Sequence, residues 1–304
     1  MDHPIRHTDQ IDLRRRVVQL FAKSYYVQRS SNIVFVCGGN NNDHMRVQFR
    51  QFCEENVDDF DIFFPEYAME NYFKEMSEEP FNIAQFEEIV GDLSHAIVLF
   101  PEAPGSFAET GYFSKIKGLY QKTILVLDAP RQKSDSFISL GPAKLINEGS
   151  NFHPNVQIDY QAPEFNQILD RIRRYEISST KRTLQMKEFA GMSNFQKLAI
   201  IQKIVDILSI ATIEDIVFML RGLFASRLSI ALARKLISIL VGAQFIVPVG
   251  DFGHYYGNSS KKQLLTLKDG FVTTEMGLRL ELATVYESEE IDFVKLIEGT
   301  RDAH

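Results

Sequence analysis

The chain has 304 residues, of which 45% are hydrophobic and 24% charged, and its formal net charge is -7. These values are typical of a globular protein with room for two domains, and they exclude an intrinsically disordered chain. Two cysteines, Cys37 and Cys53, are too few for a disulfide framework or a cysteine-based zinc site. We therefore expect reduced thiols and no bound metal.

Short apolar runs alternate with amphipathic segments through the first half of the chain. We predict strands at residues 32–37, 61–64, 95–100, 123–128 and 155–159, and helices at 44–56, at 82–93 and from Phe107. Buried strands that alternate with helices are typical of a parallel sheet covered on both faces. The sequence thus predicts an α/β fold with a Rossmann-like parallel sheet, forming a domain over residues 1–175.

Three loops follow predicted strand ends, where ligands bind in open parallel sheets. They read "GGNNND" at 38–43, "PEY" at 65–67 and "PEAPGS" at 101–106. The candidate substrate contacts are loop residues with a flexible backbone or a polar side chain, together with the aspartate that ends the fourth strand. They are Gly38, Gly39, Asn40, Glu66, Glu102, Gly105, Ser106 and Asp128. The first loop is equally compatible with an ordinary strand-to-helix turn, and Asp128 with an Asx turn. Arg46 is either a diphosphate ligand or a solvated helix residue.

Residues 176–304 form the second predicted domain. Helical patterns at 195–209, 212–224 and 227–245 precede two short strands expected around the "KDG" turn at 268–270, an order that indicates a winged helix. The net charge is -10 over residues 1–170 and +3 over 171–304. Candidate nucleic-acid or partner contacts are the cations Arg227, Arg234, Lys235, Lys261, Lys262 and Lys268, although a winged helix also serves for protein docking.

No segment predicts export or membrane insertion. The N-terminus carries charges throughout, and the longest uncharged apolar run, residues 236–250, is shorter than the roughly 20 residues of a membrane span. We therefore expect a cytoplasmic protein.

Glu109 allows two interpretations. With Ser106 it has the S-x-x-E spacing of a capping box, which requires no function. However, Glu66 and Glu102 end neighbouring loops, and carboxylates crowded in one crevice are typical of functional sites. A carboxylate beside a glycine-rich loop suits attack at an anomeric carbon or stabilisation of an oxocarbenium-like transition state. Under this second interpretation Glu109 is the catalytic residue of N-glycosidic bond cleavage.

Four motifs occur in a specific order: "IVFVCGGN", "DIFFPE", "FPEAPGSFAETGYF" and "SFISLGPAKLI", followed by "LTLKDGFVTTEMG" near the C-terminus. Together they resemble the nucleoside 2-deoxyribosyltransferase-like effectors encoded beside retron reverse transcriptases. The resemblance implies that Glu109 is catalytic, that NAD is the substrate and that no separate cofactor is needed. Deoxyribosyltransferases place an aspartate six residues before the nucleophile, where this chain has Ala103, so hydrolysis is favoured over transfer.

The same resemblance implies an anti-phage toxin held in a complex with a reverse transcriptase and its multicopy single-stranded DNA, and a homo-oligomer within that complex is compatible with it. Two other functions fit the sequence. One is a metabolic nucleoside deoxyribosyltransferase or nucleotide hydrolase. The other is a non-enzymatic regulator that senses a nucleotide and binds DNA, because fold alone does not separate these classes.

Overall fold

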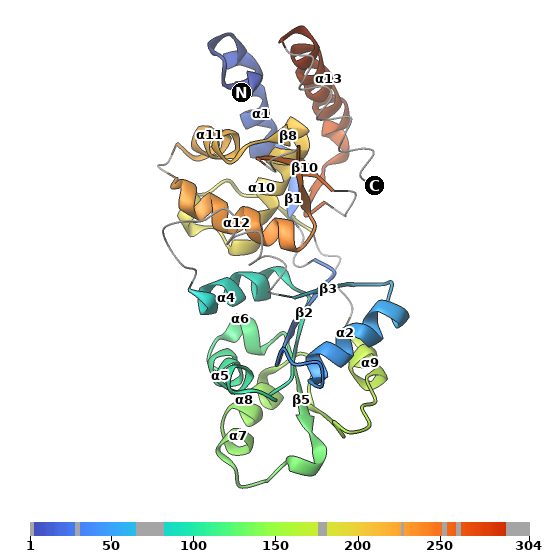
Figure 1. The fold of residues 1–304 in the computed structure, drawn as a ribbon. Coiled ribbons are helices and arrows are strands. Elements are labelled where there is room, and N and C mark those ends of the chain that lie inside the picture. The colour runs from blue at the N-terminus through green and yellow to red at the C-terminus, as the bar shows by residue number, and fades with distance from the viewer. Residues whose placement is uncertain are drawn as a thin grey trace. The chain divides into compact units, whose positions relative to one another are not determined.

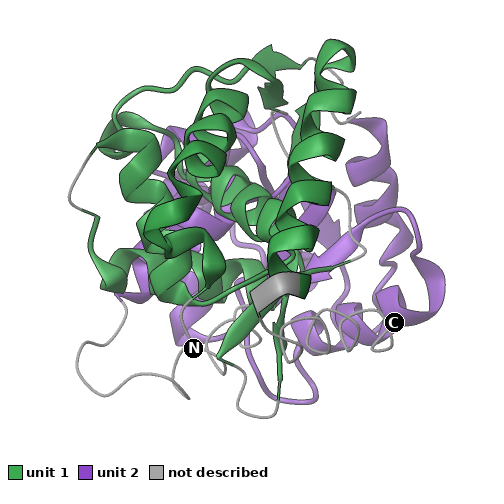
Figure 2. Ribbon diagram, turned by 90° about the horizontal axis from the view of Figure 1, so that it is seen from above, with its two compact units in different colours: residues 1–29, 66–79, 179–304 green, residues 30–65, 80–178 purple. Residues whose placement is uncertain are grey.

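A computed structural model describes residues 3–27, 31–64, 82–175, 181–225, 228–250, 254–259 and 263–289. The chain divides into two compact units (Figure 2). The α/β unit takes in residues 30–65 and 80–178, and the helical unit takes in residues 1–29, 66–79 and 179–304. The change near residue 178 lies close to the predicted boundary at 175. The assignment of the N-terminal 29 residues differs from the prediction, since they group with the C-terminal part of the chain.

The α/β unit is built on a five-stranded, fully parallel sheet with the order β3-β2-β4-β5-β6. Its strands are β2 (Ile33–Cys37), β3 (Asp61–Phe63), β4 (Ala96–Leu99), β5 (Thr123–Asp128) and β6 (Val156–Ile158). The prediction of a parallel α/β sheet is confirmed. Strands β2 and β4 are buried at every position, as expected of strands with helices on both sides.

Helices cover both faces of this sheet (Figure 1). One face carries α2 (Met45–Asn56) and α9 (Asn166–Arg174), and the other carries α4 (Ile83–Leu93), α5 (Pro104–Phe113), α6 (Lys117–Tyr120) and α8 (Pro142–Gly149). The short helices η3 (Ala129–Arg131) and α7 (Phe137–Leu140) follow β5. On the α2 and α9 face, Phe49 packs against Phe100 and Phe165 at centroid distances of 5.7 and 5.4 Å. This aromatic core packs α2 and the start of α9 against the carboxyl end of β4, which pairs with β2.

The helical unit combines both ends of the chain. After η1 (Pro4–Arg6) and η2 (Thr8–Gln10), α1 (Ile11–Lys23) leads into β1 (Tyr25–Val27). Strand β1 is the central member of an antiparallel sheet, between β11 (Leu265–Leu267) and β7 (Arg182–Thr183). Helix α13 (Val272–Glu289) packs against α1. The N-terminal segment is therefore part of the fold of this unit.

Between these ends the helical unit contains helices and a second small sheet. The order is η4 (Phe189–Gly191), α10 (Asn194–Leu208), β8 (Ile210–Ala211), α11 (Ile213–Phe224), α12 (Ile230–Gly242), β9 (Ile246–Val249) and β10 (Tyr255–Asn258). Strands β8, β10 and β9 form an antiparallel sheet in that order. Within the described residues, no helix is both long enough and apolar enough to cross a membrane.

The prediction of two strands around the "KDG" turn is wrong. Strand β11 precedes the turn, but Asp269–Phe271 is the 3-10 helix η5 and the following segment is α13. Packing against α1 stabilises a helix in the segment after the turn. The hairpin of this region is formed by β9 and β10 instead.

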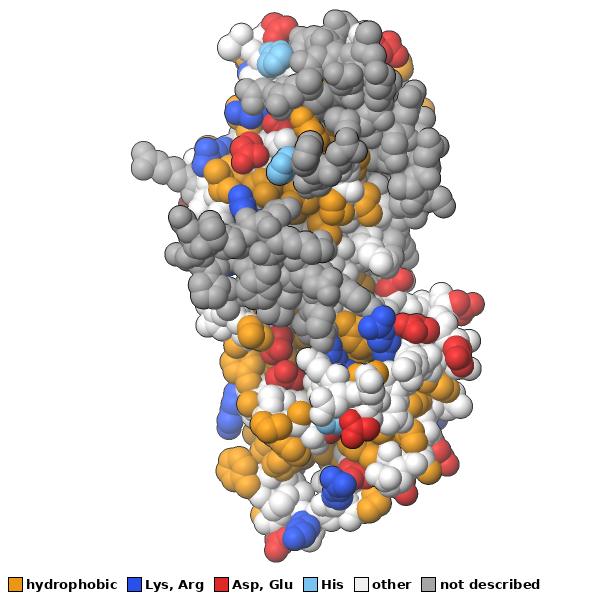
Figure 3. All heavy atoms as spheres, in the orientation of Figure 1, with side chains coloured by type: hydrophobic (Ala, Val, Ile, Leu, Met, Phe, Trp, Pro, Cys, Tyr) orange, Lys and Arg blue, Asp and Glu red, His pale blue; other side chains and the backbone are white. Residues whose placement is uncertain are grey.

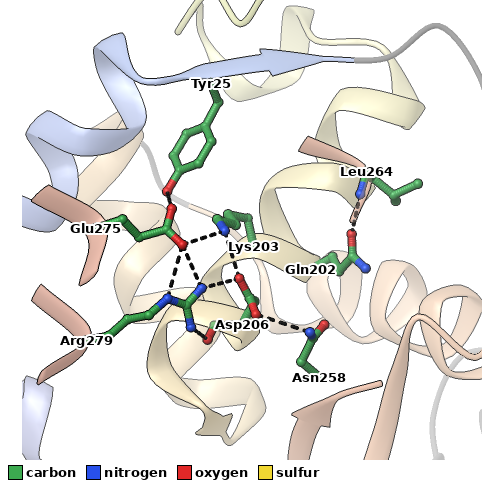
Figure 4. A network of polar contacts seen from close by, with 8 residues as sticks. All are labelled: Tyr25, Gln202, Lys203, Asp206, Asn258, Leu264, Glu275 and Arg279. Atoms are coloured by element: carbon green, nitrogen blue, oxygen red, sulfur yellow. Dashed lines mark hydrogen bonds and ion pairs between the residues drawn. The ribbon is translucent and has the colours of Figure 1, made fainter. Parts of the chain in front are cut away.

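A buried network of charges joins three elements of the helical unit (Figure 4). Lys203 of α10 donates to Asp206 at 2.8 Å and to Glu275 of α13 at 2.9 Å. Tyr25 of β1 donates to the second oxygen of Glu275 at 2.6 Å, and Arg279 contacts both carboxylates. Pairing with these cations and with the tyrosine lowers the pKa of Glu275 despite its burial. The network thus ties the N-terminal strand to the C-terminal helix.

Candidate functional site

Helix α5 begins earlier than predicted, and this excludes the capping-box interpretation of Ser106 and Glu109. The helix starts at Pro104 after Ala103, so Ser106 occupies its third position and Glu109 its sixth. Ser106 is therefore not the N-cap residue, and Glu109 is not the third residue of a capping box. Glu109 lies in the second turn of the helix, and the capping explanation for it is wrong.

Ser106 instead organises the loop that precedes the helix. Its buried hydroxyl accepts hydrogen bonds from the backbone N–H groups of Glu102 and Ala103, both at 3.0 Å, and donates to the Ala103 carbonyl at 3.0 Å. The candidate substrate contact Ser106 is thus fully engaged in holding Glu102 in place.

Glu102 connects the loop after β4 to the loop after β2. Its Oε1 accepts from the backbone N–H groups of Gly39 at 3.0 Å and Arg46 at 3.2 Å, and its Oε2 accepts from Met45 at 2.6 Å. Met45 and Arg46 are the first two residues of α2, so the carboxylate satisfies free N–H groups at a helix N-terminus. Glu102 is therefore a structural bridge between two loops of the sheet edge.

Gly38 and Gly39 are needed for contacts within the protein. A Cβ on Gly39 would lie 1.9 Å from Nδ1 of His44, and one on Gly38 would lie 2.7 Å from Cβ of Arg46. His44 itself accepts a hydrogen bond from the Asn41 N–H through that same nitrogen. The glycines let this loop fold back on α2, which places Asn40 and Arg46 near each other.

Arg46 is buried, with only 7% of its surface exposed. Its guanidinium donates to Oδ1 of Asn40 and to the Gly38 carbonyl, and it lies 5.4 Å from the ring centroid of Phe64. The interpretation of Arg46 as a solvated helix residue is wrong. Its positive charge also favours the ionised form of Glu87 and so opposes the rise in the pKa of that carboxyl group.

Glu109 forms a carboxyl pair with Glu87, a residue in the middle of α4. The two side chains are hydrogen-bonded to each other. Burial, the charge of Glu109 and this hydrogen bond raise the pKa of Glu87 to about 8, although Arg46 opposes the shift. At neutral pH Glu87 therefore holds a proton and acts as a donor, the arrangement expected of two carboxyl groups with different chemical roles.

A pocket of about 360 Å³ opens on the edge of the sheet, beyond the ends of β4 and β5. Asp128 lies in its wall, accepts from the Tyr160 N–H at 3.2 Å and pairs with Arg131 at 3.1 Å. Charged, polar, aromatic and aliphatic side chains share the wall: Pro101, Glu102, Phe107, Leu127, Asp128, Arg131, Gln132, Lys133, Ser136, Phe137, Ile138 and Tyr160. Figure 3 shows hydrophobic side chains gathered over the α5 and α7 region, and Phe137 is 85% exposed.

This lining suits a ligand with a flat ring and anionic groups. Exposed aromatic side chains offer surfaces for stacking, Arg131 and Lys133 supply positive charge, and Asp128 is an acceptor for hydroxyl groups. Burial and the charges of Glu102 and Asp128 raise the pKa of Tyr160, which donates to the Val126 carbonyl at 2.8 Å. Tyr160 is thus held as a neutral phenol.

The remaining candidate residues are distributed over both units. Gly105 is exposed in the first turn of α5, with open space around its Cα. Glu66, Arg227, Lys261 and Lys262 lie outside the described residues. Arg234 and Lys235 are half-buried on α12. Lys268 lies between β11 and η5 and not in a β-hairpin, so it is not on a wing. Its ammonium donates to the Lys23 carbonyl at 2.6 Å.

Sequence reasoning missed Glu87, the carboxyl group that interacts with Glu109. It lies in "NIAQFEEIVGDL", which reads as an ordinary amphipathic helix, and Glu87 and Glu88 both look like solvated residues. A signal was present, because Glu87 is three residues before Val90 and four before Gly91 and therefore shares the apolar face of that helix. An acidic residue on a buried face requires a partner, which the structure identifies as Glu109.

Fold and site together define an α/β protein with a carboxyl pair at the edge of a parallel sheet and a separate helical unit. Residues 42–247 match the STM3845 retron effector protein family, and the chain belongs to this family. The resemblance to retron effectors is thereby confirmed at the level of the family.

Two curated proteins of Escherichia coli are similar to the chain. The "Retron Ec86 putative ribosyltransferase/DNA-binding protein" is 35% identical over 134 residues, 42% of each chain. The "Retron Ec73 putative ribosyltransferase/DNA-binding protein" is 30% identical over 186 residues, 54% of this chain and 57% of that protein. The chain spans about half the length of the curated relatives it matches.

Proposed function

We propose that this retron effector cleaves the N-glycosidic bond of a nucleotide, with NAD as the substrate and hydrolysis to nicotinamide and ADP-ribose as the reaction. The observation that carries the proposal is the hydrogen-bonded pair of Glu109 and Glu87 at the carboxyl edge of the sheet. The printed names of the two relatives, which include ribosyltransferase, support chemistry at a ribose carbon. The nucleoside deoxyribosyltransferase-like character of the α/β unit is part of this proposal.

Glu109 is the catalytic residue in this mechanism. Its carboxylate meets the positive charge that develops at C1′ while the bond from C1′ to the pyridinium nitrogen breaks. The bonding electron pair moves to that nitrogen, so nicotinamide leaves as a neutral molecule without a proton donor. Water then supplies the hydroxyl group at C1′ and releases one proton.

Glu87 and Arg46 prepare Glu109 for this role. The protonated Glu87 donates to Glu109 and so orients the carboxylate, and Arg46 balances the negative charge that two adjacent carboxyl groups bring. Glu102 and Ser106 act one step further away, since they connect the loops that precede the helices of Arg46 and Glu109. In this proposal the nearby pocket with Asp128, Phe107 and Phe137 receives the remainder of the nucleotide.

Product analysis by mass tests the proposal. The purified chain, alone and with its reverse transcriptase and DNA, is incubated separately with NAD and with deoxynucleosides. Release of nicotinamide from NAD, lost in Glu109→Gln, is the expected result. Base exchange between deoxynucleosides without NAD cleavage would instead support the metabolic transferase.

We propose a winged-helix function for the helical unit, supported by the order of its elements. Helix α10, strand β8, helices α11 and α12 and the hairpin of β9 and β10, with sheet order β8-β10-β9, follow the helix-strand-helix-helix-hairpin pattern of that motif. In this proposal the unit engages the retron reverse transcriptase and its multicopy single-stranded DNA, which hold the toxin inactive. The term DNA-binding in the names of both relatives favours nucleic-acid contact.

A non-enzymatic regulator is the second candidate, because the same helical unit would serve it. Unlike the glycosidase, this regulator would require no catalytic turnover at Glu109. A chain that binds NAD and nucleic acid but leaves NAD intact under all partner conditions would support the regulator.

A further inference from the structure

A second cavity, of about 560 Å³, lies within the helical unit and takes no part in the site described above. Its walls come from the C-terminal half of α1, from η5 and from the first turns of α13. Helices α1 and α13 pack against each other, and all the walls of the cavity belong to the helical unit.

Hydrogen-bond donors are concentrated on these walls. Ser24 is fully buried, and its Oγ has no hydrogen-bond partner among the described residues. Buried hydroxyl groups are nearly always satisfied, so this unpartnered one requires a partner that the described residues do not supply, such as a ligand or a water molecule. Thr273, Thr274 and Gln19 add exposed hydroxyl and amide donors to the same cavity.

The charge of the cavity is positive. Lys23 has no ion pair in the part of the chain that the structure describes, while the single carboxylate of the wall, Glu281, is paired with Arg16. Lys268 covers the carbonyl groups at the end of α1, since its ammonium donates to Lys23 and its backbone N–H donates to Ser24. Lys23 therefore contributes a positive charge to the same wall as the unpartnered hydroxyl.

Apolar side chains complete the walls. Leu20 and Leu278 are buried, and Phe271 is half-buried. A ligand that fits must combine an anionic, acceptor-rich group with a flat apolar part. Phosphate groups are bound by Lys, Arg, Ser, Thr and Gln side chains, and bases stack on aromatic rings.

We infer that this cavity binds one phosphate-bearing nucleotide, with its phosphate at Lys23, Ser24, Thr273 and Thr274 and its base against Phe271. The nucleotide is a unit of single-stranded nucleic acid or a free mononucleotide, because both present the same chemistry. This site lies apart from the hairpin and α12, and it does not depend on the proposed glycosidase activity.

Fluorescence anisotropy of the full-length chain with a labelled ten-residue oligothymidylate tests the inference, with AMP as competitor. Lys23→Gln removes the charge, and Gly277→Leu fills the cavity from a position where an added Cβ meets open space. Arg15→Gln is the matched control, since Arg15 lies on the same helix, is exposed and does not line the cavity. Each test variant should weaken binding about tenfold, and Lys23→Gln should reduce the salt slope by about one.

Comparing oligonucleotide binding with competition by AMP shows whether the nucleotide belongs to a strand or is free. Tight oligonucleotide binding with weak AMP competition identifies a strand, and equal competition by AMP identifies a free nucleotide. The inference is overturned if neither ligand binds, if Lys23→Gln and Arg15→Gln behave alike, or if Gly277→Leu disturbs only the association with a protein partner.

Discussion

The carboxyl groups of Glu87 and Glu109, which come from consecutive helices, are hydrogen-bonded to each other. This contact makes one proton part of the folded structure at neutral pH, because the pKa of Glu87 is raised to about 8. It also removes the simplest structural explanation of Glu109, since a helix-capping residue would contact backbone N–H groups rather than a second carboxyl.

Glu109→Gln should give a folded protein without glycosidase activity. The substitution removes the charge that meets the oxocarbenium-like centre, and the loss of one such group costs roughly 10² to 10³ in rate. The melting temperature should stay close to that of the unchanged protein, because Glu109 caps no helix. NAD turnover and thermal denaturation are measured together, with Glu148→Gln on the exposed side of α8 as the control. A variant that keeps turning over NAD would direct attention to Glu87.

Folding stability should decrease as the pH rises from about 5 to about 8. Glu87 binds a proton in the folded state up to about pH 8, whereas in the unfolded chain it releases the proton near the ordinary glutamate pKa of 4.5. Between these values the folded state binds more protons, so the free energy of unfolding falls with increasing pH. Urea unfolding at several pH values measures this slope.

Glu87→Gln supplies the control for that measurement, because the glutamine side chain does not titrate. The slope between pH 5 and 8 should be smaller in this variant. An unchanged slope would mean that the pair titrates in the same way in the folded and unfolded states.

Two glycines of the sheet edge should respond in opposite ways to alanine. Gly39→Ala places a methyl group against the His44 ring and should lower the melting temperature, because the loop must move away from α2. Gly105→Ala should raise stability by about 0.5 to 1 kcal/mol, since its position is helical and open. If the Gly105 backbone contacts substrate, the same variant raises KM for NAD without lowering stability. Scanning calorimetry and steady-state kinetics distinguish these effects.

The N-terminal segment should be required for folding of the helical unit. Strand β1 is the central strand of its sheet, and Tyr25 donates to the buried Glu275. A fragment of residues 179–304 should therefore be unfolded by circular dichroism, and a version with residues 1–29 joined through a flexible linker should recover helicity. A cooperative melting transition in the shorter fragment would show that β1 is dispensable.

Local patterns in the sequence were sufficient for the α/β sheet. Runs such as "IVFVC" and "TILVLD" are apolar at nearly every position, and this is a consequence of burial on both faces that can be read without coordinates. The position of Glu109 shortly after a strand end predicted a place near the carboxyl edge of the sheet, because a helix that follows a parallel strand begins at that edge. The predicted start of this helix, at Phe107, was too late. The helix begins at Pro104, because a proline can begin a helix as well as belong to a turn.

Contacts between distant segments were decided only by the tertiary structure. Strand β1 pairs with β11 about 240 positions later in the chain, and no local pattern records that pairing. The roles of the carboxylates depend on distance in the same way, since Glu102 meets the N–H groups of another loop and Glu87 meets Glu109 across two helices. Residue type and periodicity determine which side chains are buried, but hydrogen bonds and pKa shifts depend on atoms a few ångströms apart, and only the packing of the helices on the sheet sets those distances.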